Sequence, residues 1–287
     1  MSTELIAVTG ATGQLGGRVA QRLADAGVAQ RLVVRDLTRA PRLAGAEPVT
    51  GSYGDPAALR AALAGVDTVL LVSAGEAPNR VALHTAAVDA AIEAGVSRIV
   101  YTSFVGATPD ATFTFGRDHW HTEQHIRGTG VDFTFLRDNM YLDFMPLLAG
   151  ADRVIRGPAG DGRLGGVARD DIADAATAVL LDDAHGGHSY DLSGPAAFTL
   201  AEAAEELTRA TGRPVRYVAE TLDEAYASRS GYGAPDWEVA GWVTSYSAIA
   251  AGELDVVSDA VATITGHPPR SLAEYLDANP AALDHLR

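Results

Sequence analysis

The sequence contains neither cysteine nor lysine, and the two absences exclude several kinds of chemistry. Without cysteine, the chain forms no disulfide, no thiolate nucleophile and no cysteine-ligated zinc site. All 22 basic residues are arginine. The missing lysine excludes a Schiff-base lysine, a P-loop lysine and the tyrosine–lysine pair of many short-chain dehydrogenases.

Positive charge and long apolar runs are also scarce. The formal net charge is −15 and the isoelectric point about 4.8, so nucleic acid and anionic membrane surfaces are poor partners. The longest uncharged run, Val239–Gly252, is shorter than the roughly 20 residues of a membrane span. The first residues carry no basic stretch followed by an apolar one, so we expect no secretory signal and a cytoplasmic location.

The first half of the chain alternates apolar, β-branched runs with alanine-rich stretches. The runs lack polar alternation, as expected for strands that are covered on both faces. Each alanine-rich stretch is a predicted helix that ends in a Gly-Val pair, where glycine takes the left-handed conformation. The predicted strands are Leu5–Thr9, Arg31–Arg35, Thr68–Ser73 and Arg98–Ser103, with a weaker one at Glu47–Thr50, and the predicted helices are Gln14–Ala26, Ala57–Ala64 and Arg80–Ala94. This repeat predicts a parallel sheet with helices on both faces.

The second half is less regular, and it contains both sheet-forming and helical segments. The predicted strands are Phe133–Arg137 and Ser189–Leu192, the predicted helices are Ile172–Leu181 and Thr199–Thr211, and Gly157–Gly166 is a glycine-rich loop. From Asp223 onward the chain is mostly helical, with breaks at Gly231-Tyr232-Gly233 and Pro268-Pro269. This half is expected to add strands to the main sheet and a small helical cap.

The strongest motif joins the first predicted strand to the first predicted helix. Gly10 permits the tight turn, Gly13 lets the backbone approach a pyrophosphate, and Gly16 allows the helix to pack closely on the strand. A pyrophosphate is further favoured by the positive end of the helix. The predicted cofactor-binding residues of this turn are Gly10, Ala11, Thr12, Gly13, Gln14 and Leu15.

This motif and the repeated strand–helix units predict an α/β fold, a Rossmann-type doubly wound parallel sheet with a small, mostly helical C-terminal cap. The dinucleotide-binding domain is expected to comprise residues 1–137 and 166–194. The substrate-side cap is expected to comprise residues 138–165 and 195–287.

The end of the second predicted strand selects the cofactor. An acidic residue there accepts from the ribose hydroxyls of NAD, whereas an arginine binds the 2′-phosphate of NADP. The strand ends in Arg35 followed by Asp36, so we favour NADPH, with NAD on Asp36 as the alternative. The predicted strand that begins at Thr68 ends in Ser73, Ala74 and Gly75. These small residues would let a dinucleotide cross the sheet edge; the alternative is that they form an ordinary turn.

Further segments carry a resemblance to a known family. They are Val8–Gly17, Val34-Arg35, Tyr53-Gly54-Asp55, Val100–Ser103, Thr122-Glu123, Phe135-Leu136-Arg137 with Tyr141, Ala159–Gly162 and, more loosely, Tyr190-Asp191-Leu192 and Gly266-His267-Pro268. With these segments the chain resembles an atypical short-chain dehydrogenase of the NmrA-like group. It is most similar to the type-2 NAD(P)H:quinone oxidoreductases and the triphenylmethane reductases.

The resemblance implies an NADPH-binding domain, further cofactor contacts in the segment Asp138 to Asp143, and reduction of a quinone or a similar electron-poor aromatic substrate. The contacts expected from that segment are Asp138, Asn139 and Met140. One departure is Gln124, which stands where the quinone reductases carry a lysine. The triphenylmethane reductases lack this lysine too, so its loss does not exclude activity.

Two polar residues are candidates for the chemistry. Tyr141 follows a strand end and is either a donor to a quinone oxygen or a packing tyrosine. His119 lies four residues before Glu123 on the same helix face, and it is either a donor to substrate or a structural histidine. His121 and His125 share a face but have no third ligand, so we predict no metal site.

Two other functions remain open. One is a non-catalytic, NADP(H)-sensing regulatory protein of the NmrA-like group, because the fold alone does not separate sensors from enzymes. The other is a tailoring ketoreductase, which the missing lysine disfavours because an alkoxide needs a proton donor. A homodimer is also left open as the assembly.

Overall fold

The computed structural model describes residues 4–287, which fall into two compact units. The first unit consists of the residues up to Ser103 with Asp118–Arg137 and Asp170–Tyr190. The second consists of Phe104–Arg117, Asp138–Arg169 and Asp191–Arg287. Among residues 4–287, every helix is too short or too polar to cross a membrane.

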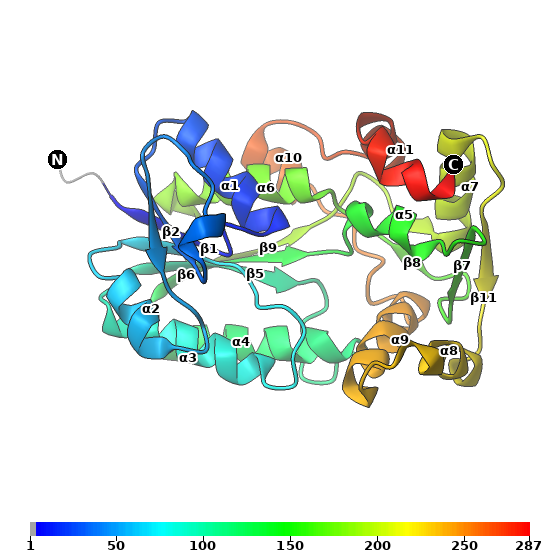
Figure 1. Ribbon diagram of the computed structural model, residues 1–287, viewed down its shortest axis with the longest axis horizontal. Helices are drawn as coiled ribbons and strands as arrows, with labels where there is room; N and C mark the ends of the chain where they lie inside the picture. Colours follow the sequence, from blue (N-terminus) through cyan, green and yellow to red (C-terminus); the bar gives the residue numbers. More distant parts are fainter. Residues whose placement is uncertain (1–3) are drawn as a thin grey trace. The chain divides into compact units, whose positions relative to one another are not determined.

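A seven-stranded sheet has the order β3-β2-β1-β4-β5-β6-β9 (Figure 1). The recorded pairings of β1 through β5 are parallel. The strands are β1 (Ile6–Thr9), β2 (Gln30–Val34), β3 (Ala46–Thr50), β4 (Thr68–Leu71), β5 (Arg98–Phe104), β6 (Asp132–Asp138) and β9 (His188–Leu192). Strand order therefore reverses beside β1, which confirms the predicted doubly wound Rossmann-type fold and the weak strand β3.

Helices cover both faces of this sheet (Figure 1). Helices α1 (Gln14–Asp25) and α6 (Arg169–Leu180) lie on one face, and α2 (Pro56–Ala62), α3 (Arg80–Glu93) and α4 (Thr114–Thr129) on the other. Strands β1 and β4 are buried along their whole length, as their unbroken apolar sequence predicts. The predicted helix-ending glycines all take the left-handed conformation: φ is 72° at Gly27, 76° at Gly65 and 88° at Gly95.

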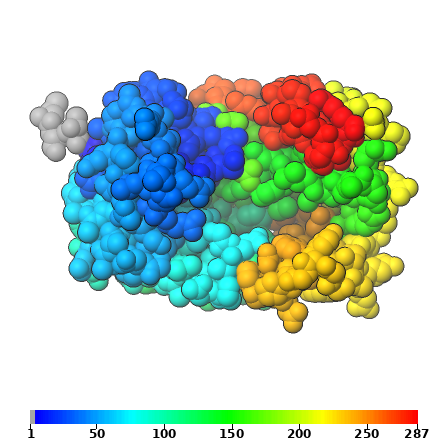
Figure 2. Space-filling view, in the orientation of Figure 1, coloured from blue at the N-terminus to red at the C-terminus, as the bar shows by residue number. Residues whose placement is uncertain are grey.

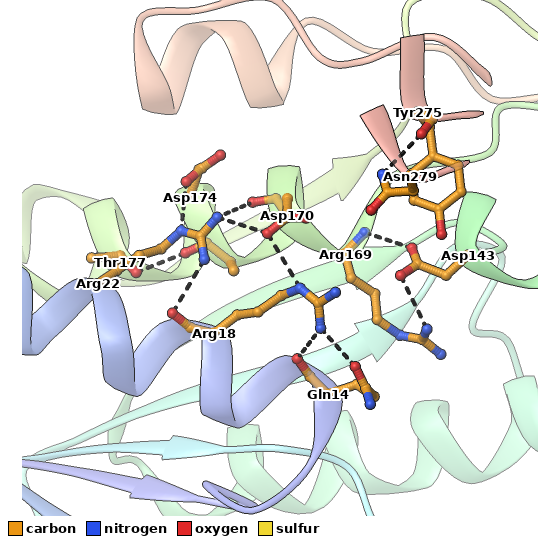
Figure 3. A network of polar contacts seen from close by, with 11 residues as sticks. Gln14, Arg18, Arg22, Asp143, Arg169, Asp170, Asp174, Thr177, Tyr275 and Asn279 are labelled. Atoms are coloured by element: carbon orange, nitrogen blue, oxygen red, sulfur yellow. Dashed lines mark hydrogen bonds and ion pairs between the residues drawn. The ribbon is translucent and has the colours of Figure 1, made fainter. Parts of the chain in front are cut away.

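Arginine–aspartate pairs join α1 to α6 (Figure 3). Arg18 Nε lies 3.2 Å from Asp170 Oδ1, and Arg22 Nε lies 2.6 Å from Asp174 Oδ1. The four side chains are each about one-fifth to one-third exposed, so water screens the pairs. They align the two helices on the sheet more than they stabilise the fold.

The second unit is built from short elements. Three of its helices begin with a capping box, at Thr199, Thr221 and Ser271. The C-terminal α11 and η5 pack on α7, as the red and yellow surfaces in Figure 2 show. The elements are η2 (Leu142–Phe144), α5 (Met145–Leu148), β7 (Val154–Gly157), β8 (Arg163–Leu164), β10 (Phe198–Thr199), α7 (Leu200–Thr211), β11 (Arg216–Ala219), α8 (Leu222–Arg229), η4 (Ser230–Tyr232), α9 (Asp236–Ala250), α10 (Ala260–Thr265), α11 (Leu272–Ala278) and η5 (Pro280–Leu286).

The mostly helical tail and its two breaks are confirmed. The prediction of an uninterrupted loop at Gly157–Gly166 is wrong, because it contains β8, which pairs with β10. The pair of β7 with β11 was not predicted either. These strands have two to four residues, too few for a periodic pattern to be visible in the sequence.

Candidate functional site

A cleft of about 600 Å³ lies in the first unit, where the strands around the reversal point end. Each wall is the segment that follows one strand. The lining residues are Thr9 at the end of β1 with Gly10 and Thr12–Gly16 after it, Val33–Arg35 at the end of β2, Gly51–Gly54 after β3, Val72–Ala77 after β4, and Leu83 in α3. Parallel α/β sheets bind their ligands in this position, outside the carboxyl ends of the strands.

The loop from β1 to α1 has the tight geometry that its glycines predict. Gly10 has φ +64°, and its carbonyl accepts from the N–H of Gly13 at 2.8 Å. A Cβ on Gly16 would lie 2.5 Å from the carbonyl oxygen of Gly10, a distance that no side chain tolerates. Gly16 is therefore required for α1 to pack directly on the end of β1.

The first turn of α1 faces the cleft without a side-chain cap. Gly13 is the N-cap residue, and no side chain accepts a hydrogen bond there. The first turn also contains no acidic residue. Its backbone N–H groups and the positive end of the helix dipole are therefore available to an anion, and the absence of a Cβ on Gly13 leaves room for it. A dinucleotide pyrophosphate fits this site.

The side chains of Arg35 and Asp36 have different surroundings in the structure. Arg35 is exposed and lines the cleft directly after the end of β2. Asp36 instead caps the short helix η1 (Leu37–Arg39), where its Oδ1 accepts from the N–H of Thr38 at 2.9 Å and from its hydroxyl at 2.6 Å. These hydrogen bonds also lower the pKa of Asp36. The geometry favours the arginine, and so a phosphorylated ribose, over the NAD alternative.

Nine of the thirteen residues predicted to bind the cofactor line the cleft; the others are Ala11, Asp138, Asn139 and Met140. Ala11 is buried beneath the turn. The other three belong to the second unit, where the side chain of Asn139 donates to the carbonyl of Leu254 at 3.0 Å.

The cleft wall after β3 was not predicted from the sequence. Tyr53 lines the cleft, and its hydroxyl donates to the carbonyl of Val72 at 2.7 Å while lying 2.6 Å from Thr9 Oγ1. The signal in the sequence was the glycine-rich segment Gly51–Gly54 directly after the weak strand β3.

Tyr141 and Asp138 form a hydrogen-bonded pair in the second unit. The hydroxyl of half-buried Tyr141 donates to Asp138 Oδ2 at 2.9 Å. Asp138 is fully buried, and its Oδ1 has no hydrogen-bond partner. Burial raises the pKa of Asp138 to about 8, although the Tyr141 hydroxyl and the charge of Arg169 both act to lower it. The carboxyl group is therefore largely protonated at neutral pH.

The surroundings of Tyr141 are aromatic and cationic. Its ring stacks on Phe144 with centroids 5.6 Å apart. The guanidinium of Arg169 lies 4.7 Å from the centre of the Tyr141 ring and is paired with Asp143 at 3.2 Å (Figure 3). The guanidinium also lies 4.6 Å from the centre of the Phe144 ring, so it contacts both stacked rings through cation–π interactions.

We expect Asp138→Asn to stabilise the protein increasingly as pH rises. The raised pKa means that the native state binds this proton more tightly than the unfolded chain between about pH 4 and about pH 8. The free energy of unfolding of the unmodified protein therefore falls through that window, and asparagine removes the loss. Thermal unfolding of both proteins at about pH 5 and about pH 8 measures the difference. The same difference in stability between the two proteins at both pH values would contradict the raised pKa of Asp138.

His119 lies inside the first unit. Only 5% of it is exposed; its Nε2 accepts from Arg80 Nη2 at 3.0 Å, and its Nδ1 lies 2.9 Å from the hydroxyl of Tyr101. Burial lowers the pKa of His119 well below its usual value. Both ring nitrogens are engaged, which favours the structural histidine over the substrate donor. Among residues 4–287, no three potential ligands gather into a metal site.

Residues 10–183 match a family of proteins described as NAD(P)H-binding. The NAD(P)H azoreductase of Xenophilus azovorans is 34% identical, over 97% of this chain and 99% of its own length. Quinone oxidoreductase 2 of Escherichia coli is 36% identical, over 94% of this chain and 96% of its own length.

Solved structures agree with these relatives. The NADPH-dependent quinone oxidoreductase of E. coli complexed with NADPH has a TM-score of 0.88 at 33% identity and covers 95% of this chain and 99% of its own. The triphenylmethane reductase of Citrobacter complexed with NADP(H) has a TM-score of 0.84 at 32% identity, with the same coverage. The resemblance drawn from the sequence motifs is confirmed, and the chain belongs to the NAD(P)H-binding family.

Proposed function

We propose that the protein is an NADPH-dependent oxidoreductase that transfers hydride to a quinone or a related electron-poor conjugated aromatic acceptor. The observation that carries the proposal is similarity along nearly the whole chain to a quinone oxidoreductase solved with NADPH. Similarity to an azoreductase and to a triphenylmethane reductase supports a conjugated acceptor.

The cleft supplies the groups that this cofactor needs. The backbone N–H groups at the start of α1 would bind the pyrophosphate, and Arg35 would bind the 2′-phosphate. The small residues Ser73–Gly75 would leave room for the dinucleotide to cross the sheet edge. When bound, NADPH supplies the hydride.

The missing lysine fits an acceptor that needs little acid catalysis. Reduction of a quinone gives an anion that resonance already stabilises, and a cationic dye accepts hydride without a proton. The chain then has to position the acceptor and exclude water, for which the aromatic side chains of Tyr141 and Phe144 are suited. Reduction of a ketone would develop an alkoxide, which needs a proton donor in contact with the substrate. Asp138 is fully buried, and the Tyr141 hydroxyl already donates to it.

The direct test is oxidation of NADPH by the purified protein with benzoquinone or a triphenylmethane dye as acceptor. We expect sustained turnover with at least one of them. Saturable NADPH binding without turnover on either acceptor would favour the NADP(H)-sensing alternative. Turnover on simple ketones alone would favour the ketoreductase.

We expect Tyr141→Phe to lower kcat for quinone reduction by about tenfold or less. The change removes the phenol but keeps the ring that stacks on Phe144. A true general acid contributes about 10²–10⁴-fold, so a small loss indicates positioning. The assay uses saturating NADPH and a soluble quinone. A loss of about a thousandfold with unchanged NADPH affinity would identify Tyr141 as the acid and reopen ketone reduction.

A homodimeric assembly and a cytoplasmic location are part of this proposal. Sedimentation velocity at several protein concentrations tests the assembly. A single species with the mass of one 29.8 kDa chain at every concentration would contradict the dimer.

A further inference from the structure

The cleft wall after β4 is fixed by side chains from neighbouring elements. Three successive backbone N–H groups beyond the strand end donate to side chains: Val72 to Thr9 Oγ1 at 2.9 Å, Ser73 to Thr102 Oγ1 at 2.8 Å, and Ala74 to His84 Nε2 at 2.8 Å. Ser73, Ala74 and Gly75 have short side chains and cannot anchor the loop by packing. Its backbone is therefore held from outside.

The Ala74 residue is held at both of its backbone polar groups. Its N–H donates to His84 Nε2, and its carbonyl accepts from Arg80 Nε at 2.9 Å. Both side chains come from α3. His84 is fully buried and Arg80 is 6% exposed, and neither is among the residues that line the cleft. His84 and Arg80 therefore hold the backbone of the cleft wall without lining the cleft themselves.

The hydrogen bonds of His84 require one tautomer. Because Nε2 accepts from Ala74, the ring proton of the neutral imidazole is on Nδ1. His84 Nδ1 lies 2.9 Å from Thr122 Oγ1, whose hydroxyl donates to the carbonyl of Asp118 at 2.8 Å. The threonine oxygen can therefore accept a hydrogen bond from the Nδ1–H of His84, so every donor in this chain of hydrogen bonds faces an acceptor.

A second layer fixes Arg80 and keeps His84 neutral. Arg80 Nη2 donates to His119 Nε2 at 3.0 Å, and His119 Nδ1 lies 2.9 Å from the hydroxyl of buried Tyr101. Burial, assisted by the charge of Arg80, lowers the pKa of His84 to about 3. The imidazole is therefore uncharged at neutral pH, the form in which Nε2 accepts from Ala74.

We propose that His84 and Arg80 are positioning residues that set the affinity of the cleft for its dinucleotide by fixing the Ala74 backbone. The proposal rests on the proposed function, since it takes NADPH as the ligand of this cleft. A wall already ordered in the free protein loses little conformational entropy when the ligand binds. Without the acceptor on His84, the Ala74 N–H is left unpaired, and the loop moves to solvate it.

The test compares His84→Leu with His84→Gln by titration calorimetry with NADPH and NADH. Leucine fills the space without an acceptor, whereas the amide oxygen of glutamine reaches about as far as Nε2. We expect His84→Leu to weaken both cofactors by about tenfold, the effect of roughly one buried hydrogen bond. His84→Gln should remain within about threefold of the unmodified protein. His84→Ala, which also removes the acceptor, replaces the leucine variant if that does not fold.

Thermal unfolding of each variant separates positioning from loss of stability. A reversibly unfolded fraction weakens the apparent Kd only in proportion to the folded fraction. A tenfold loss of affinity in a variant that is more than about nine-tenths folded therefore comes from the cleft itself. Thr134→Val is the matched control. Thr134 lies on β6 in the same unit, is fully buried, and accepts a hydrogen bond from Arg98 Nη2 at 3.1 Å. It should leave the NADPH Kd unchanged.

Unchanged affinity in His84→Leu, or an equal loss in Thr134→Val, would overturn the positioning role and leave the proposed function intact. Failure of the unmodified protein to bind NADPH would overturn both.

Discussion

Replacing Gly13 with valine is expected to abolish NADPH binding while the protein remains folded. Gly13 has φ −93° and ψ 177°, extended values that valine adopts readily, so the backbone is not strained. The new Cβ would lie 3.1 Å from the carbonyl oxygen of Gly10, and its two methyl groups would fill the space in front of the α1 N–H groups. The loss expected is about hundredfold or more, because the pyrophosphate can no longer reach those donors.

Calorimetry with NADPH and far-ultraviolet circular dichroism together test this expectation. Gly128→Val is a suitable control in the same unit, because a Cβ added to Gly128 in α4 would meet no heavy atom within 4 Å beyond its own helix backbone. It should bind NADPH like the unmodified protein. Retained affinity in Gly13→Val with an unchanged spectrum would mean that this turn does not bind the phosphates.

The βα repeats of the first unit were predictable because each is a local pattern. An unbroken apolar run, an alanine-rich helix and a closing glycine follow one another within about thirty residues, the length of a βα unit. Strands β7 and β11 were not predictable for the opposite reason. Val154 pairs with Arg216, far away in sequence, and neither strand is long enough to show a pattern of its own.

The same contrast applies to the site. Gly10, Arg35 and Ser73 lie at or just after the ends of three predicted strands. Because a parallel sheet brings the carboxyl ends of its strands to one edge, their position in one cleft was predictable from the sequence. Arg80 and His84 were missed because their roles depend on contacts among α3, α4, β5 and the loop after β4. The burial of His119 was left open for a related reason. Glu123, one turn further along the same helix, carries a charge, and only the tertiary fold shows that both residues are buried.

Replacing Arg35 with alanine is expected to remove most of the preference for NADPH over NADH. Arg35 is exposed at the cleft, directly after the last residue of β2, where the 2′-phosphate of a bound dinucleotide would lie. A charge-assisted, bidentate contact to phosphate accounts for about tenfold to hundredfold in affinity. NADH has no such phosphate, so its Kd should be almost unchanged. The ratio of the two Kd values in the variant is therefore the quantity to measure.

Arg39→Ala is the matched control for this change. Arg39 is an exposed arginine four residues further along the same loop, and it is not among the residues that line the cleft. Its loss should reduce NADPH affinity by about twofold or less, through a screened long-range attraction alone. Raising the salt concentration should weaken NADPH binding in both the unmodified protein and Arg39→Ala, and much less in Arg35→Ala. Equal Kd values for NADPH and NADH in the unmodified protein would refute the assignment of Arg35 to the 2′-phosphate. An equal effect of the two substitutions would instead indicate that the positive field of the loop, rather than a direct contact, selects the cofactor.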